Sequence, residues 1–287
     1  ALQLSDSNLF FSSLRNIDSV PQESFFQPIY LTKIYLSNST PMGWKNSAQW
    51  KSKINSKDKH DGNITFTSDH SCLFFSRCQT NTYIPSNCEI FKSKFNKGSF
   101  QKPEKLNNKI NLQGYSATQP SFSGKNCKTD GVLYFSSDRP GGYGKSDIWY
   151  SIYKDGKFHE PVNLGSIINT PSDEITPFYH TQTGILYFSS DWHAGIGGFD
   201  IFKSKGALGE WAEPINMGIP INSNANDLYF SVNEIDKDGY LTSNRKGSMF
   251  IKGETCCNDI FSYTWTEKQN VTEPEIVEII KDTIEEI

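Results

Sequence analysis

Internal repetition constrains the fold of this 287-residue chain more than any other feature. One landmark is a strand that ends in small polar residues, as in residues 133–138. A second is an acid followed by an apolar and an aromatic residue, as at Asp147, and a third is an aromatic residue eleven positions before an asparagine, as in Phe158 and Asn169. The first two recur five times (the second once in a weaker form, at residues 28–30) and the third four times, always in the same order. The chain therefore repeats one supersecondary unit.

Each unit predicts four short antiparallel strands. Residues 185–189 and 148–153 illustrate a second and a third strand, and Asp155-Gly156 supplies the positive φ of a tight hairpin turn. Proline cannot donate to a ladder, so a proline three residues after the landmark aromatic predicts an outer edge strand. These prolines are Pro103, Pro161 and Pro214. At spacings of 53 to 64 residues, the units predict an all-β protein, a five-bladed β-propeller of four-stranded antiparallel blades over residues 1–265.

The carboxyl-terminal segment, residues 266–287, carries 2 lysines against 7 acids, a net charge of −5. We predict that it is an acidic linker or tail. The fifth unit has no aromatic-x-x-proline fourth strand after Trp265, which leaves two alternatives. Either residues 270–287 substitute for that strand, or it lies upstream of Ala1 in a longer parent chain.

Composition excludes several classes of protein. The lysines between residues 28 and 110 lie beside serine and asparagine, without arginine clusters or interleaved aromatics, so nucleic-acid binding is not predicted. No apolar run approaches the ~20 residues of a membrane span. None of the six cysteines forms a C-x-x-C pair and the five histidines are scattered, so no metal site is predicted. Cys78 and Cys88 bracket a ten-residue excursion between two strand signals, which predicts a disulfide and suits an oxidising compartment.

Residues 133–149, with their continuation at residues 160–165, resemble the TolB-type, WD40-like propeller repeat of bacterial envelope proteins. They are particularly similar to repeats of OmpA-family lipoproteins of Bacteroidota, some of which belong to the type IX secretion and gliding machinery. The resemblance implies a periplasmic, outer-membrane-associated protein whose partners are envelope proteins of such a complex. Peptidoglycan binding would require an OmpA-like domain that this chain does not contain.

The candidate carboxylates repeat once per blade, whereas a catalytic residue is expected once. We therefore interpret the acids that head each third strand (Glu89, Asp147, Asp200 and Asp259) as structural, because a carboxylate there can accept loop N–H groups. Asp61, Glu174 and Asp227 also occupy matching positions, on the first strands. Residues 236–239 hint at a calcium loop, but a turn is favoured. No catalytic residue and no cofactor are predicted.

The loops that join strands two and three emerge on one face and vary most between units. Arginine, tryptophan and tyrosine on a rigid scaffold are the types that form interface hot spots. The predicted partner-binding residues are Arg139, Tyr143, Trp192, His193, Arg245 and Lys246. The alternative for Arg139 and Arg245 is that they only hold their own hairpins together.

Two classes of function follow. The main prediction is a non-catalytic interaction scaffold of the cell envelope, and not an enzyme. The alternative is a five-bladed glycoside hydrolase or lyase that projects carboxylates into the central channel, or a small-ligand sensor. The fold alone does not separate these classes, since propellers have many functions.

Overall fold

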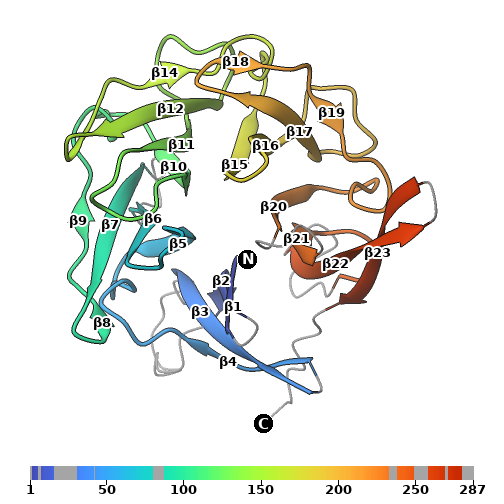
Figure 1. The fold of residues 1–287 in the computed structure, drawn as a ribbon, viewed down its shortest axis with the longest axis horizontal. Helices are drawn as coiled ribbons and strands as arrows, with labels where there is room; N and C mark the ends of the chain where they lie inside the picture. Colours follow the sequence, from blue (N-terminus) through green and yellow to red (C-terminus); the bar gives the residue numbers. More distant parts are fainter. Residues whose placement is uncertain are drawn as a thin grey trace, which may run out of the picture.

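A computed structural model describes residues 2–5, 8–15, 31–41, 43–79, 87–232, 238–248, 258–268 and 271–279. Five small antiparallel sheets stand side by side in a closed ring (Figure 1). The predicted five-bladed β-propeller is therefore confirmed. Among the described residues, no helix is long and apolar enough to cross a membrane.

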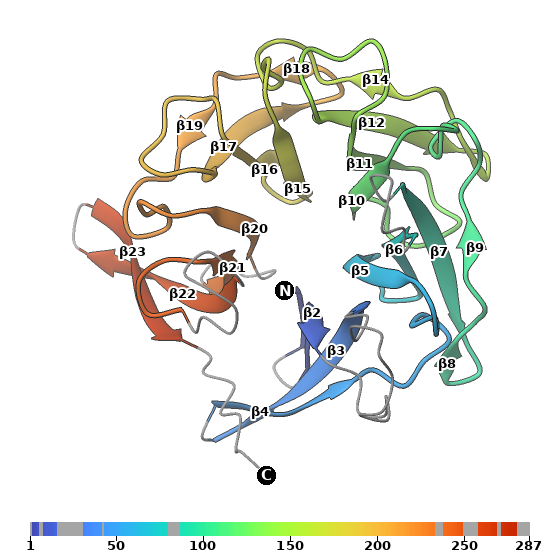
Figure 2. The same ribbon diagram turned by 180° about the vertical axis from the view of Figure 1, so that it is seen from behind.

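Each blade runs outward from the centre of the ring in chain order (Figure 2). Blade one contains β1 (Leu2–Ser5), β2 (Asn8–Arg15), β3 (Leu31–Thr40) and β4 (Gly43–Gln49). Blade two contains β5 (His60–Phe66), β6 (Cys72–Cys78), β7 (Cys88–Asn96), β8 (Ser99–Phe100) and β9 (Glu104–Lys105). Blade three contains β10 (Ala117–Phe122), β11 (Gly131–Ser137), β12 (Asp147–Lys154), β13 (Lys157–Phe158) and β14 (Val162–Asn163). Blade four contains β15 (Glu174–His180), β16 (Ile185–Ser190), β17 (Asp200–Ala207), β18 (Glu210–Trp211) and β19 (Ile215–Asn216), and blade five contains β20 (Asp227–Val232), β21 (Asp238–Ser243), β22 (Asp259–Lys268) and β23 (Val271–Ile279).

The outermost strand differs from the prediction in blades two to four. There the single expected fourth strand is split into two pieces of two residues each, both paired with the third strand. Proline lacks the N–H that a continuous ladder requires, so it interrupts the strand. The prolines that come directly before the second pieces are Pro103, Pro161 and Pro214.

Blade five is completed by the acidic tail. β23 pairs antiparallel with β22 as the outer strand of the blade, which is the first of the two alternatives for that strand. The predicted boundary at residue 265 falls inside β22. Part of the tail is thus a blade strand instead of a linker.

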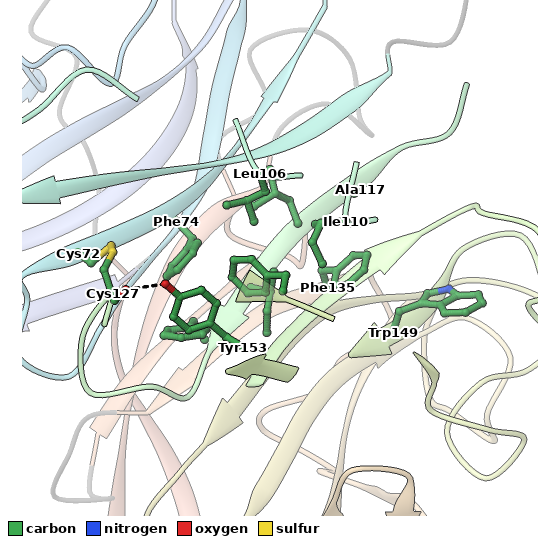
Figure 3. Packing of buried hydrophobic residues seen from close by; sticks show 13 residues of the cluster. Cys72, Phe74, Leu106, Ile110, Ala117, Cys127, Phe135, Trp149 and Tyr153 are labelled. Atoms are coloured by element: carbon green, nitrogen blue, oxygen red, sulfur yellow. Dashed lines mark hydrogen bonds between the residues drawn. A yellow bond between two sulfur atoms is a disulfide. The ribbon is translucent and has the colours of Figure 1, made fainter. Parts of the chain in front are cut away.

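Packing between blades forms the hydrophobic core. In the cluster between blades two and three, Phe74, Phe135 and Tyr153 lie together, and Tyr153 Oη donates a hydrogen bond to the Cys127 carbonyl (Figure 3). Similar clusters lie between blades one and two, three and four, and four and five. The strands supply an apolar face on both sides of a sheet, so blades two, three and four each bury their faces against two neighbours.

A buried asparagine explains the third sequence landmark. Asn169 Oδ1 accepts the Ile148 N–H at 2.8 Å, and its Nδ2 donates to the Ile148 carbonyl at 2.9 Å. The amide of Asn169 thus pairs with the β12 backbone in the way that a neighbouring strand would. The same two bonds, always 21 residues back, are made by Asn55, Asn111 and Asn222.

Two disulfides join described cysteines. Cys78 and Cys88 face each other on β6 and β7 with a Cα–Cα distance of 4.0 Å, which is the predicted pair. Cys72 pairs with Cys127 at a Cα–Cα distance of 5.6 Å and links blade two to the β10–β11 loop of blade three. Cys256 and Cys257 lie outside the described residues.

Candidate functional site

Three buried carboxylates occupy equivalent positions near the start of the inner strands β5, β15 and β20. Asp61, Glu174 and Asp227 have no exposed surface. Each accepts both the backbone N–H and the side-chain hydroxyl of a serine or threonine in the preceding connector. These donors are Ser56, Thr170 and Ser223, respectively, at 2.5 to 2.9 Å. The carboxylates therefore anchor the connectors between blades, as their repetition predicts.

The charges that face these three carboxylates differ. Asp61 is paired with Arg77 at 2.6 Å and with the buried Lys33 at 3.3 Å, and Asp227 is paired with Arg245 at 2.5 Å. Among the described residues, no ion pair reaches Glu174.

Glu174 is instead surrounded by neutral donors. Ser190 Oγ donates a third hydrogen bond to its carboxylate at 2.7 Å, beside the two from Thr170. Burial raises the pKa of Glu174, and the hydrogen bonds and the nearby His193 oppose this only in part. The carboxyl therefore holds its proton to higher pH than an exposed glutamate.

Two loops flank Glu174 on the face where the inner strands begin. On the blade-three side, Glu174 N–H donates to the Ser146 carbonyl at 2.7 Å. That loop carries Tyr143, whose exposed fraction is 54%. On the blade-four side, the Trp192 N–H donates to Ser190 Oγ, and Trp192 is 61% exposed. Two exposed aromatic side chains thus lie in the loops next to one buried acid.

The structure divides the predicted partner-binding residues into two groups. Tyr143, Trp192 and Lys246 are exposed, and the partner-binding role predicted for them stays a prediction. Arg139, His193 and Arg245 point back into the protein and donate to connector carbonyls. The carbonyls reached are those of Ile110, Ile168 and Ile221, respectively.

Arg139 shows why the two arginines are not surface contacts. It is 7% exposed, its guanidinium lies over the Phe135 ring at 4.8 Å, and burial lowers its pKa to about 10. Arg139 and Arg245 therefore fasten a connector from the preceding blade, and not only their own hairpins. The sequence missed this role because the acceptors are backbone carbonyls, which leave no signal in side-chain patterns.

Two of the acids at the head of the third strands, Asp147 and Asp200, hold loops as predicted, whereas Glu89 pairs with Lys105 and the role of Asp259 stays a prediction. Asp147 accepts the N–H groups of Tyr143 and Gly144, and Asn163 Nδ2 donates to it at 2.8 Å. Asp200 holds the corresponding loop of blade four through the N–H groups of residues 196 and 197. These bonds fix the glycine-rich loops that carry the exposed aromatics. In the part of the chain that the structure describes, no three histidine, cysteine or acidic side chains form a group that could hold a metal, and residues 236 and 237 of the considered calcium loop lie outside it.

Polar, uncharged side chains of the inner strands meet at one level near the centre of the ring. Four inner-strand residues that are not glycine adopt positive φ at a β-bulge, namely Asn63, Gln119, Thr176 and Tyr229. Gln119 Nε2 donates to Tyr229 Oη at 3.2 Å, which links blade three to blade five. Gln119 Oε1 also accepts the Thr176 N–H at 2.9 Å. Bulges re-aim side chains at the rims of barrels, and strained residues of this kind cluster at functional sites.

No protein-family model and no curated protein matches the chain. Solved structures do match its fold. An exo-β-1,3-galactanase from Clostridium thermocellum matches with a TM-score of 0.57 and 12% identity over 96% of this chain and 60% of that one. A thermostable family-43 glycoside hydrolase matches with a TM-score of 0.55 and 11% identity, over 95% and 90%. An α-L-arabinofuranosidase from the same Clostridium species matches with a TM-score of 0.52 and 13% identity, over 92% and 88%.

These comparisons correct the assignment from the sequence. The solved structures named above are glycoside hydrolases, so the assignment to TolB-type and OmpA-family envelope lipoproteins is wrong. The predictions of a non-catalytic scaffold and of a chain that is not an enzyme depended on that resemblance and on the repetition of the carboxylates, and they are wrong as well. The repeat landmarks report blade architecture, which unrelated propellers share. Periplasmic location and envelope partners are not tested and stay predictions.

Proposed function

We propose that the protein is a glycoside hydrolase, with Glu174 as the acid that protonates the leaving-group oxygen. The observation that carries the proposal is the environment of Glu174. It is a buried carboxyl whose pKa is raised and which makes no ion pair among the described residues. A general acid must hold its proton at the working pH, and burial is how proteins achieve this.

Glycoside hydrolysis also requires a second carboxylate that stays ionised. Asp227 begins the next inner strand, and its ion pair with Arg245 suits the ionised form. The two acids therefore have the divided environments that acid and base roles need. Both are covered by their connectors, so the proposed reaction requires the loops around Thr170 and Ser223 to open.

The exposed aromatics support carbohydrate as the substrate class. Trp192 and Tyr143 present flat apolar rings with polar edges beside the start of β15. Such rings bury area at low entropy cost and pack against the apolar faces of sugar rings. The solved glycoside hydrolases with this fold act on arabinofuranosides, galactans and xylans, so these are the glycosides to test first.

The experiment compares Glu174→Gln with wild type on two kinds of leaving group. Loss of a general acid lowers the rate about 10²- to 10⁴-fold when the leaving group needs a proton. Dinitrophenyl glycosides need none, so they should be hydrolysed at nearly the wild-type rate. We expect a large loss on alkyl glycosides and polysaccharides and a small loss on dinitrophenyl glycosides.

Thr170→Ala is the matched control. It removes a hydroxyl bond from the same connector but keeps the carboxyl. A structural role for Glu174 predicts that both variants lose activity equally on both kinds of substrate. That result, or a wild-type protein that hydrolyses none of the glycosides, would overturn the proposal.

A further inference from the structure

A cationic cleft lies on the outer rim of the ring, away from the start of β15. It has a volume of about 380 Å³ and two walls. One wall is the connector after β9, with Asn107 and Lys109, and the other is the β12–β13 hairpin, residues 154–159. Blade two supplies the first wall and blade three the second.

The charge of the lining is positive. Three lysines, Lys109, Lys154 and Lys157, face one acid, Asp155, a net charge of +2 at neutral pH. Lys154 and Lys157 are directly opposite each other in the hairpin register. Like charges in this arrangement destabilise a hairpin, so an anion bound between the two lysines would reduce their electrostatic repulsion.

The arrangement is not part of the repeated architecture. The equivalent hairpin of blade two sets Asn96 opposite Ser99, and that of blade four sets Ala207 opposite Glu210. The asparagine clamps and carboxylate anchors recur from blade to blade, whereas opposed lysines occur in this hairpin and in neither of those two. The fold therefore does not require them.

The walls are held in place. Asn107 Nδ2 donates to the Phe158 carbonyl at 3.2 Å, and the Lys109 carbonyl accepts from Arg139 Nη1 at 3.0 Å. Phe158 is 6% exposed and belongs to the core between blades two and three. Lys109 also pairs with Glu160 at 2.9 Å, but both side chains are largely exposed, so a ligand anion can replace Glu160 at little cost.

We propose that this cleft binds the anionic groups of an acidic polysaccharide, either carboxylates or sulfate esters, as an accessory site on the rim. The inference rests on the proposed function for polysaccharide as the class of ligand. A nucleic acid would require a longer basic track with exposed stacking rings, and Phe158 is buried. Lysines on opposite walls would grip charged groups along one chain and hold the polymer against the enzyme.

The test measures binding of polygalacturonate, dextran sulfate and neutral xylan to wild type and to K154Q/K157Q. We expect the variant to bind at least one of the two anionic polymers about tenfold or more weakly, a contrast that fades as salt rises. Comparison of polygalacturonate with dextran sulfate tells carboxylate from sulfate recognition. K125Q/K128Q, which removes two exposed lysines of the β10–β11 loop in the same blade, is the charge-matched control and should bind as wild type does.

Three outcomes would overturn the inference. They are equal weakening in the control variant, unchanged binding in K154Q/K157Q, and binding of polyglutamate or single-stranded DNA as tight as that of the polysaccharides. Hydrolysis of neutral aryl glycosides is measured in parallel. An intact hydrolase whose K154Q/K157Q variant binds normally refutes the cleft alone, and a catalytically inert protein that shows the lysine-dependent binding refutes the hydrolase alone.

Discussion

Asn169→Ala should remove a large part of the stability of the propeller. The wild-type side chain is 1% exposed and makes three hydrogen bonds, two to the Ile148 backbone and one to Asn163 Oδ1 at 2.8 Å. Truncation leaves the Ile148 N–H without a partner, at about 1–3 kcal/mol, whereas the Ile148 carbonyl keeps the Leu164 N–H at 3.2 Å and Asn163 Oδ1 keeps the Gly165 N–H at 2.9 Å. The two bonds lost at these acceptors add about 0.5–1.5 kcal/mol each, so we expect a loss of about 2–5 kcal/mol, against a total of about 5–15 kcal/mol for a typical domain.

Urea unfolding followed by tryptophan fluorescence measures the effect, with the m-value checked for constancy. Asn222→Ala removes the same three bonds in blade four and should cost the same within about 1 kcal/mol. Asn224→Ala, at an exposed connector position, should change stability by less than about 0.5 kcal/mol. A cost below about 1 kcal/mol for Asn169→Ala would refute the clamp as a structural element.

Three further predictions concern other buried groups. Burial raises the pKa of the Glu174 carboxyl in the folded protein, so its contribution to stability is present below the pKa of the unfolded chain and is lost as the pH rises through the folded pKa. Thermal melts over this pH range should show the decline in wild type and not in Glu174→Gln. The same pH dependence of the melting temperature in both proteins would contradict the prediction. Arg139→Leu leaves two connector carbonyls unpaired and should cost about 2–4 kcal/mol in the same urea assay, whereas a neutral effect would argue against the connector role. Loop-closure entropy predicts that the free energy of unfolding falls by about 4 kcal/mol without the Cys72–Cys127 bridge and by about 3 kcal/mol without the Cys78–Cys88 bridge. A larger loss in the variant that lacks Cys78–Cys88 would contradict this prediction.

The architecture could be predicted from the sequence because it depends on signals inside one repeat. The hairpin turn at Asp155, the proline before β14 and the disulfide of Cys78 with Cys88 all join residues close in the chain. Because the same local patterns recur in each unit, their number also predicts the number of blades. The same repetition marked Asp147 as a loop anchor, which the structure bears out.

Contacts between blades could not be predicted in this way. The Cys72–Cys127 bridge spans 55 residues, and the bond from Gln119 to Tyr229 spans 110. Such pairs depend on how the ring closes, which no local pattern encodes. The position of Arg139 in a loop suggested a surface contact. In the structure its hydrogen-bond acceptors lie in the connector from the preceding blade, which the local sequence does not indicate.

Departures from the repeat, more than the repeat itself, indicate where chemistry can occur. In blade five an inner-strand acid, Asp227, meets Arg245, which also reaches the preceding connector. Blade three keeps the arginine, Arg139, but has alanine in place of the acid, so its guanidinium binds carbonyls and an aromatic ring. Blade four keeps the acid and has His193 in place of the arginine. Among the described residues, Glu174 therefore makes no ion pair of the kind that Asp227 makes with Arg245. A carboxyl in that situation lowers its desolvation cost by keeping a proton, and a proton held for that reason is available for transfer to a substrate oxygen.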